Sequence, residues 1–106
     1  MEKKELLNGL IAIKDNAEYE LKFADPDSIW ERDVKAINVA ISIVNNPSLL
    51  KKMTAEETKQ FMNQIVDMKR HSENMAHKEH ARGEFNTIWD EDVETLAAME
   101  NFLANM

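Results

Sequence analysis

The chain has 106 residues, no cysteine, two glycines, two prolines and a formal net charge of −7 from 13 basic and 20 acidic residues. This length predicts a single domain over residues 1–106, and the missing cysteines exclude disulfides, a thiolate nucleophile and a cysteine-based zinc site. The negative charge argues against nucleic acid or an anionic membrane as a direct partner, because phosphate binding depends on Lys and Arg. No apolar run approaches the roughly 18 residues that cross a bilayer. With no signal-peptide pattern at the start, we expect a soluble protein of the host-cell cytoplasm.

The first half of the chain predicts two long helices, over residues 2–22 and 29–45. Apolar residues recur in both at spacings of three and four, which is typical of amphipathic helices. The second pattern is apolar over more than half its circumference, so we expect this helix to be the most buried. Gly9 lies inside the first pattern and indicates either a frayed start or a close packing contact. Between the helices, Pro26 has no N–H to donate and so interrupts helical hydrogen bonding. Ser28 is the predicted N-cap of the second helix, and Glu31, three residues later, completes a capping box.

The second half predicts a helical turn over residues 48–53 and then two more long helices, over about 55–77 and from residue 88 onward. The polar segment 75–82 lacks the apolar stripe, so we expect the third helix to fray or project there, with Gly83 as its stop. Two capping boxes mark the helix starts. Their residues are Thr54 with Glu57, and Thr87 with Asp90.

An internal repeat links the two halves. Residues 28–34 read SIWERDV and residues 87–93 read TIWDEDV, which share a cap, Ile-Trp, an acid, any residue and Asp-Val. Further upstream the likeness is fainter. The matching residues there are Lys14, Ala17 and Glu18 with Lys69, Ser72 and Glu73. We predict a duplicated αα-hairpin, with copies at about 2–46 and 54–106, that closes into an all-α, four-helix arrangement.

The two copies have diverged in the second helix of each hairpin. Ile41 in the first copy corresponds to Glu100 in the second, which narrows the apolar face of the last helix. We therefore expect the last helix to be the most exposed of the four, with a face that could serve a homodimer.

Each predicted hairpin resembles small uncharacterised proteins from phages and mobile elements of Firmicutes. In these proteins a polar connector leads into Trp-x-x-Asp-Val/Ile and then an alanine-rich helix. The pattern stands here at 30–40 and at 89–98, and the second copy departs from it with Thr95 where the first has Ala36. The resemblance implies a mobile-element origin and brings no catalytic residues with it.

The three histidines lie close together, and Glu73, His77 and His80 would share one face of a continuing helix. That spacing suits zinc or nickel bound through imidazole and carboxylate. A metal site also needs well-placed supporting groups, whereas this stretch is typical of a polar helix end with solvated histidines. We expect no metal and no other cofactor.

Charged residues repeat at corresponding places in both hairpins. Asp33 corresponds to Asp92, and Lys14 corresponds to Lys69. We predict that each lysine pairs with the aspartate of its own hairpin and sets its register, as Lys14–Asp33 and Lys69–Asp92. Paired carboxylates could instead perform acid–base chemistry, but no nucleophile accompanies them and two glycines leave no room for a phosphate-binding loop, so we expect no enzyme.

Aromatic and methionine residues are the candidates for partner binding. A tryptophan in the first turn of a helix covers the end of a core or anchors a partner. Seven methionines fill a core or make a pliable surface for helical partners. The candidate interaction residues are Trp30, Trp89, Met99, Phe102 and Met106.

Three classes of function remain open. The first is a non-enzymatic interaction module, such as a phage accessory factor that modulates a host protein. The second is an oligomeric structural or assembly protein, and the third is a bundle that binds a metal or small ligand. A form of the first is an acidic inhibitor of a nucleic-acid-binding protein, although 13 basic residues among 20 acids are many for a nucleic-acid mimic.

Overall fold

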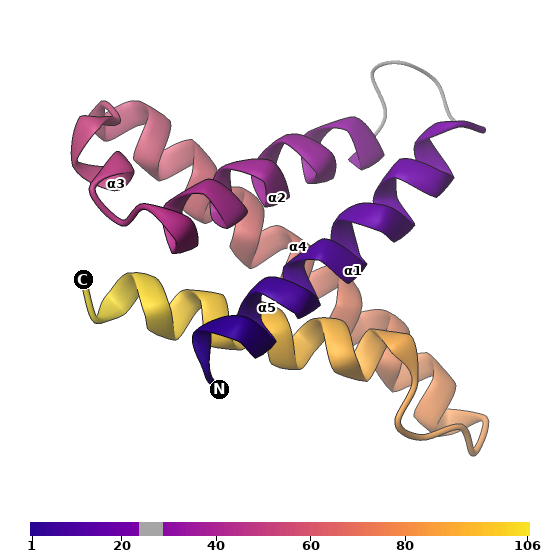
Figure 1. Ribbon diagram of the computed structural model, residues 1–106. Coiled ribbons are helices and arrows are strands. Elements are labelled where there is room, and N and C mark those ends of the chain that lie inside the picture. The colour runs from indigo at the N-terminus through magenta and orange to yellow at the C-terminus, as the bar shows by residue number, and fades with distance from the viewer. Residues whose placement is uncertain (24–28) are drawn as a thin grey trace.

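The computed structural model describes residues 1–23 and 29–106, and every regular element in those residues is a helix (Figure 1). The helices are α1 (Lys3–Leu21), α2 (Ile29–Asn45), α3 (Leu49–Lys52), α4 (Ala55–Ala81) and α5 (Ile88–Ala104). The predicted all-α class is confirmed, and α3 is the expected short helical turn. Connector residues 24–28, including the predicted cap Ser28, lie outside the described residues.

The four long helices contact one another in pairs. α1 packs along α2 and α4 packs along α5, while α1 also contacts α5 and α2 contacts α4. In Figure 1, α1 lies toward the viewer and α4 lies at the back. The molecule measures 44 × 33 × 21 Å, and the shortest dimension corresponds to two layers of helices at the usual interaxial distance of about 10 Å.

The core consists of the apolar stripes that the sequence pattern predicts, because residues spaced by three and four share one face of a helix. Six of the 17 residues of α2 are buried, which is the largest share among the long helices and confirms α2 as the most buried helix. The core residues are Leu6, Leu10, Ile13, Ala36, Ile37, Ala40, Ile43, Val44, Phe61, Ile65, Met68, Leu96, Met99 and Leu103.

Gly9 marks a close crossing of two helices. α1 is helical through this residue, so the frayed start does not occur. A Cβ atom placed on Gly9 would collide with Oγ1 of Thr95 on α5 and would stand 2.7 Å from its Cγ2. The absence of a side chain on α1 therefore lets α5 approach, and any larger residue must push the two helices apart.

The end of α4 corrects a prediction. We expected the helix to end at about His77 and to fray or project over residues 75–82, but it continues to Ala81 with Ala76 buried. Ala76 is buried and follows Met68 and Ser72 at a spacing of four, so the core-facing stripe reaches further than the polar composition suggests. Ala76 therefore packs the last turns of α4 against the core.

Gly83 ends α4 as predicted. Its φ of +85° lies in the left-handed region that favours glycine. The N–H of Gly83 donates to the carbonyl of His80 at 3.0 Å, and the N–H of Glu84 donates to the carbonyl of Glu79 at 2.9 Å. These two bonds form a Schellman motif, which satisfies carbonyls at the helix end.

α5 is not the most exposed helix, contrary to our expectation. Five of its 17 residues are buried, against four of 19 in α1 and five of 27 in α4. The reason is that α5 packs against both α4 and α1. Glu100 does not open a gap in this packing, because its carboxylate lies 3.3 Å from Nζ of Lys69 on α4. Glu100, which corresponds to Ile41 of α2, thus forms a salt bridge between α4 and α5.

The predicted cap at the start of α4 is confirmed. The N–H of Thr54 donates to Oε1 of Glu57 at 3.0 Å, and the N–H of Glu57 donates to Oγ1 of Thr54 at 3.1 Å. Reciprocal bonds of this kind satisfy two donors that the helix itself leaves free. Separately, no helix in the described part of the chain has the length and apolar character needed to cross a membrane.

Candidate functional site

The repeat seen in the sequence recurs in the pattern of burial. Adding 55 to the numbers of the four buried residues of α1 gives four buried residues of α4. These are Leu6, Leu10, Ile13 and Ala17, with Phe61, Ile65, Met68 and Ser72. Adding 59 to the six buried residues of α2 gives five buried residues of α5 and the half-buried Phe102. Corresponding positions of the two halves therefore face the same core.

A small cavity, the central cavity, lies where these corresponding positions meet. It offers about 20 Å³ to a water molecule. Ten of its eleven lining residues form five corresponding pairs, and Leu96 is the eleventh. The pairs are Ile13 with Met68, Asn16 with His71, Ala17 with Ser72, Trp30 with Trp89, and Asp33 with Asp92. The structure thus brings both tryptophans and both aspartates of the repeated motif to one place.

The two tryptophans are half-buried around this cavity. The ring of Trp89 stands edge-on to the ring of His71, with 5.5 Å between the centroids. Neither indole projects freely from the bundle as an anchor for a partner does. Their position at the cavity wall gives them a role in closing and lining the core.

Asp33 is 7% exposed and has one strong donor beside it. Nε2 of Gln64, on α4, donates to its Oδ1 at 2.7 Å. Burial raises the pKa of the Asp33 carboxyl, while the Gln64 hydrogen bond and the charge of nearby His71 lower it in part. The donor comes from the other half of the chain, so this bond fixes α2 against α4.

Asp92 is equally buried, at 7% exposed, but its surroundings differ. Within residues 1–23 and 29–106, no hydrogen bond to its carboxyl is formed. Burial, and to a smaller extent the negative charge of Glu91, raise the pKa of Asp92 to about 6. The residue that corresponds to Gln64 is Gly9, which has no side chain to donate.

The predicted lysine–aspartate pairs are wrong. Nζ of Lys14 lies 3.7 Å from Glu18, and Nζ of Lys69 lies 3.3 Å from Glu100. Both lysines remain partly exposed at helix surfaces, whereas Asp33 and Asp92 turn toward the core. If the ammonium group of a lysine turned toward a buried aspartate, it would lose its hydration. By pairing with a surface carboxylate instead, the lysine keeps its hydration.

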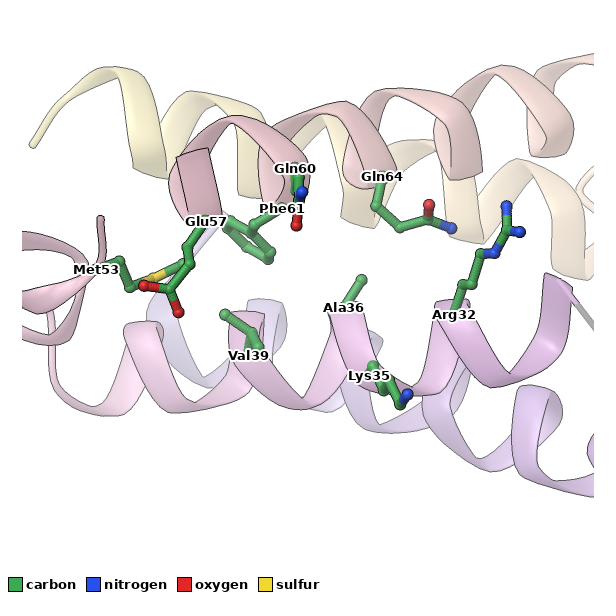
Figure 2. A pocket seen from close by; sticks show the side chains of 9 residues that line it. All are labelled: Arg32, Lys35, Ala36, Val39, Met53, Glu57, Gln60, Phe61 and Gln64. Atoms are coloured by element: carbon green, nitrogen blue, oxygen red, sulfur yellow. The ribbon is translucent and has the colours of Figure 1, made fainter. Parts of the chain in front are cut away.

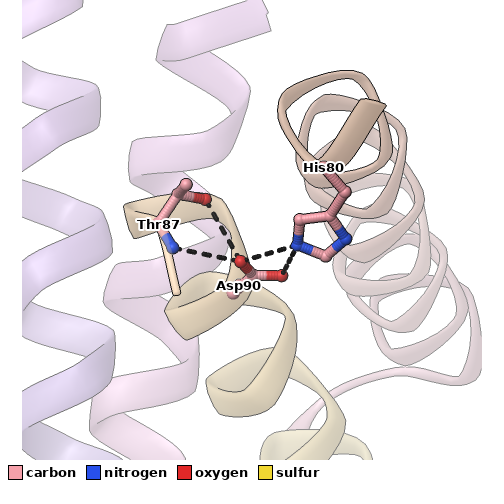
Figure 3. A network of polar contacts seen from close by, with 3 residues as sticks. All are labelled: His80, Thr87 and Asp90. Carbon is pink, nitrogen blue, oxygen red and sulfur yellow. Dashed lines mark hydrogen bonds and ion pairs between the residues drawn. The ribbon is translucent and has the colours of Figure 1, made fainter. Parts of the chain in front are cut away.

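The histidine cluster also differs from the metal-binding hypothesis. His80 points across the turn to α5, where its Nε2 lies 2.9 Å from the carboxylate of Asp90 (Figure 3). Glu73 and His77 are exposed on α4, and over the described residues no three His, Asp or Glu side chains are arranged to hold a metal. The histidine is used instead to fasten the start of α5.

This fastening completes the predicted cap of α5. The N–H of Thr87 donates to Oδ2 of Asp90 at 3.0 Å, as the capping-box prediction requires. The ring of His80 stacks on Phe85, with 5.0 Å between centroids. The His80 hydrogen bond, followed by the Thr87 N–H, holds the pKa of Asp90 below its usual range.

One surface feature that the sequence did not predict is a groove between α2 and α4 (Figure 2). One hollow of about 340 Å³ and a neighbouring hollow of about 350 Å³ share Val39, Met53 and Glu57, so they form one continuous α2–α4 groove. The other lining residues are Arg32, Lys35, Ala36, Asn38, Ser42, Ile43, Leu49, Gln60, Phe61 and Gln64.

The side chains of this groove divide into an apolar floor and charged ends. Figure 2 shows Val39 of α2 and Phe61 of α4 pointing into the space between the helices, with Met53 closing one end. Arg32 stands at the opposite end. The Glu57 carboxylate lies near Met53, where the capping box with Thr54 holds it in place.

A second groove lies between α1 and α5 and corresponds to the first. This α1–α5 groove, of about 440 Å³, contains Phe102 and Met106, two of the predicted interaction residues. Met99 is different, because it is 0% exposed between Leu96 and Leu103 and is unavailable to a partner. The remaining lining residues are Met1, Lys3, Leu6, Ala98, Asn101 and Asn105.

Comparison of the chain with family models, curated proteins and solved structures finds no match.

Proposed function

We propose that the protein is a non-enzymatic protein-interaction module that holds an amphipathic helical segment of a partner in the α2–α4 groove. The observation that carries this proposal is the continuous apolar floor of Val39, Met53 and Phe61 between two long helices. Grooves of this type accept the apolar stripe of a helix through residues spaced by three and four. Met53 suits such a site because an unbranched thioether adapts to different anchors.

The charged ends define the chemistry of the partner. Arg32 and Lys35 flank one end of the groove in a chain whose net charge is −7, and Glu57 flanks the other. A segment with acidic residues at the Arg32 end and a basic residue at the Glu57 end would be complementary to both. Charge complementarity of this kind fixes orientation and partner choice more than it adds affinity.

The test is capture of a partner from a lysate of the native host with groove variants. Met53→Glu places a charge on the apolar floor and should reduce recovery of the partner at least tenfold. Lys51→Glu is the matched control, because Lys51 is exposed on the same connector and lies outside the groove. Both variants must show native circular dichroism. Equal recovery with both variants would contradict this site.

Charge reversal gives a second, independent arm. Arg32→Glu should weaken capture, while Arg70→Glu, at an exposed position of α4 outside the groove, should not. The loss should be greatest at low salt, because exposed charges are screened at high ionic strength.

An oligomeric assembly protein is the second candidate, supported by one observation. In the second half of the chain, Glu91 and Glu94 correspond to Arg32 and Lys35 of the first half. The basic pair of one molecule could therefore face the acidic pair of another molecule. Light scattering distinguishes the candidates. A stable dimer that dissociates on Arg32→Glu and reforms when Glu91→Arg is added would favour self-assembly.

A duplicated hairpin of mobile-element origin belongs to the same proposal. Its support is the matched burial of α1 with α4 and of α2 with α5, and the five corresponding pairs around the central cavity. Under this proposal the module is an accessory factor in the cytoplasm of the host. An acidic inhibitor of a nucleic-acid-binding protein is one form of it, and a phosphate-binding partner recovered in the capture would identify that form.

A further inference from the structure

The outer faces of α1 and α4 carry the same pattern of exposed residues. Residues spaced by three and four share one face of a helix, so each set forms a continuous stripe. As with the buried positions, adding 55 to the numbers in α1 gives the numbers in α4. The α1 stripe is Lys4, Asn8, Ile11, Asp15 and Glu18, and the α4 stripe is Lys59, Asn63, Val66, Arg70 and Glu73.

The two stripes are more alike than the buried faces of the same helices. Three of the five stripe positions hold the same residue in both helices, and a fourth holds Ile11 in one and Val66 in the other. None of the four corresponding buried pairs of α1 and α4 is identical. Packing limits which residues a core accepts, whereas substitutions on the surface change stability little. The likeness of the two exposed stripes therefore points to a contact that these faces make outside the molecule.

An apolar residue stands at the centre of each stripe. Ile11 is 45% exposed and Val66 is 39% exposed, and Met62, one turn before Val66, is 42% exposed. Each centre would lose apolar surface to water if a second helix crossed over it, and burial of that surface favours association.

The charges of the two stripes are complementary to each other. Each stripe begins with lysine and ends with glutamate, at seven residues or about 10 Å on either side of its apolar centre. When two stripes cross antiparallel at their centres, the lysine end of each meets the glutamate end of the other. Asp15 gives the α1 stripe a net charge of −1, whereas Arg70 gives the α4 stripe a net charge of +1. Complementary charge therefore favours a pair of unlike stripes over a pair of like stripes.

The positions of the two helices prevent the stripes from meeting within one molecule. α1 and α4 each pack against both α2 and α5, so they occupy diagonal corners of the bundle. Figure 1 shows α1 toward the viewer and α4 at the back. The exposed faces of these helices consequently turn away from each other, and each needs a second molecule to cover it.

We propose that the α1 stripe of one molecule binds the α4 stripe of a second copy of this chain in antiparallel orientation. The residues brought together are Ile11 with Val66, Lys4 with Glu73, and Glu18 with Lys59. Glu18 is 46% exposed and its ion pair with Lys14, at 3.7 Å, is loose, so its carboxylate can turn to a lysine of the second molecule. Each molecule keeps one stripe free after the first contact, and such a heterologous contact extends into a ring or an open chain.

This contact is separate from the surface proposed for a partner. The residues that line the α2–α4 groove lie outside both stripes, so a molecule in the assembly still presents its groove. Arg32→Glu and Met53→Glu, which alter the groove, should therefore leave self-association unchanged.

The experiment measures the mass of the intact chain by sedimentation velocity from about 10 μM to about 1 mM, where weak interfaces associate. The unaltered chain should grow beyond a dimer as its concentration rises. Its association constant should fall by about tenfold or more from low to high salt, because exposed charges are screened. Ile11→Glu and Val66→Glu should each remain monomeric. Ile88→Glu is the matched control, at a 47% exposed position of α5 outside both stripes, and should associate like the unaltered chain.

Mixing the two blocked variants tests which stripes pair. Ile11→Glu keeps an intact α4 stripe and Val66→Glu keeps an intact α1 stripe, so the mixture should form a dimer and nothing larger. Charge exchange tests the orientation. Lys59→Glu should weaken association, and adding Glu18→Lys should restore it by re-forming the pair with the charges reversed.

Four outcomes would overturn the proposal, provided that all variants show native circular dichroism. An unaltered chain that stays monomeric over the whole concentration range would leave the stripes without this partner. Undiminished association of Ile11→Glu would place the contact elsewhere. A dimer formed by either blocked variant alone would show that like stripes pair, and failure of Glu18→Lys to restore association would exclude the antiparallel orientation.

Discussion

The two buried aspartates occupy corresponding positions in the two halves of the molecule but have different neighbours. Asp33 accepts a hydrogen bond from Gln64, whereas the residue that corresponds to Gln64 in the other half is Gly9. Burial raises the pKa of both carboxyls, and that of Asp92 reaches about 6. The two halves thus share the buried carboxyl but not its donor, because the donor depends on which side chain the crossing helix carries.

The packing at the two crossings explains this difference. Where α1 meets α5, the small residue is Gly9 on α1 and the larger one is Thr95 on α5. At the corresponding crossing of α4 and α2, the larger residue is Gln64 on α4 and the small one is Ala36 on α2. The small and the large residue are therefore on opposite partners at the two crossings. Only at the α2–α4 crossing does the large residue, Gln64, reach an aspartate.

The largest expected effect is a gain in stability when the buried Asp92 carboxyl is replaced by an uncharged group. A raised pKa means that folded Asp92 binds its proton more tightly than the unfolded chain does. Its stabilising contribution is present below pH 3.8 and is lost as the pH rises through about 6. Asp92→Asn should therefore raise the free energy of unfolding at pH 8 by up to about 3 kcal/mol, because the pKa of Asp92 lies about two units above its ordinary value.

Urea unfolding at pH 8 and pH 3.5 measures this effect, which should be absent at the lower pH. Asp33→Asn should give a smaller gain, because Gln64 already stabilises the charged form of Asp33. Equal gains for the two substitutions would show that the two carboxyls have the same environment in solution.

The next effect concerns the tight crossing. Gly9→Ala should lower the free energy of unfolding by about 2 kcal/mol, because its Cβ must displace Thr95. Asn8→Ala is the matched control, on an exposed position of the same helix turn, and should be neutral or slightly stabilising. Thr95→Ala added to Gly9→Ala should restore part of the loss in thermal unfolding. A stabilising Gly9→Ala would mean that α1 and α5 are further apart than described.

Removing the donor from Asp33 should make it resemble Asp92. Gln64→Leu keeps much of the side-chain volume but donates no hydrogen bond, so the pKa of Asp33 should rise further and about 1.5 kcal/mol of stability should be lost at pH 8. Carboxyl carbon shifts followed by NMR during a pH titration measure the pKa directly. An unchanged Asp33 titration would remove Gln64 from the explanation.

The smallest expected effect comes from moving the donor to the other half. Gly9→Gln with Thr95→Ala reproduces the residue pair of the α2–α4 crossing at the α1–α5 crossing. A glutamine at position 9 should then donate to Asp92 and lower its pKa by about one unit. The same NMR titration reads the change, with Thr95→Ala alone as control, and a lowered pKa in the control would assign the effect to the lost methyl group instead.

Much of the fold could be predicted from the sequence because it follows from local rules. The three-and-four spacing identified the buried faces, and the capping residues Thr54 and Thr87 marked where α4 and α5 begin. The wrong predictions for the lysine–aspartate pairs and for Met99 share a cause. Periodicity places Asp33 and Met99 on the core-facing side of their helices but does not say which helix lies opposite. The partners of Lys14 and Lys69 depend on that information.

The candidate site was only partly predictable. The similarity between residues 28–34 and 87–93 pointed to Trp30, Asp33, Trp89 and Asp92, and these four residues line one cavity. The Gln64 bond was missed, although the alignment of the two halves already placed Gln64 opposite Gly9 and Ala36 opposite Thr95. Such a reciprocal exchange of small and large residues is a usable signal for helix crossings. The α2–α4 groove left no comparable signal, because it depends on how far two helices stand apart.

The link between His80 and Asp90 has a consequence for the order in which the chain folds. It spans only ten residues, and loops of that length close in roughly 10–100 ns. The crossing of Gly9 with Thr95 joins segments from almost opposite ends of the chain and must form against a larger entropic barrier. We expect the α4–α5 hairpin to be structured in the folding transition state before α1 docks. Asp90→Asn should accordingly slow refolding in stopped-flow experiments, whereas Gly9→Ala should mainly accelerate unfolding.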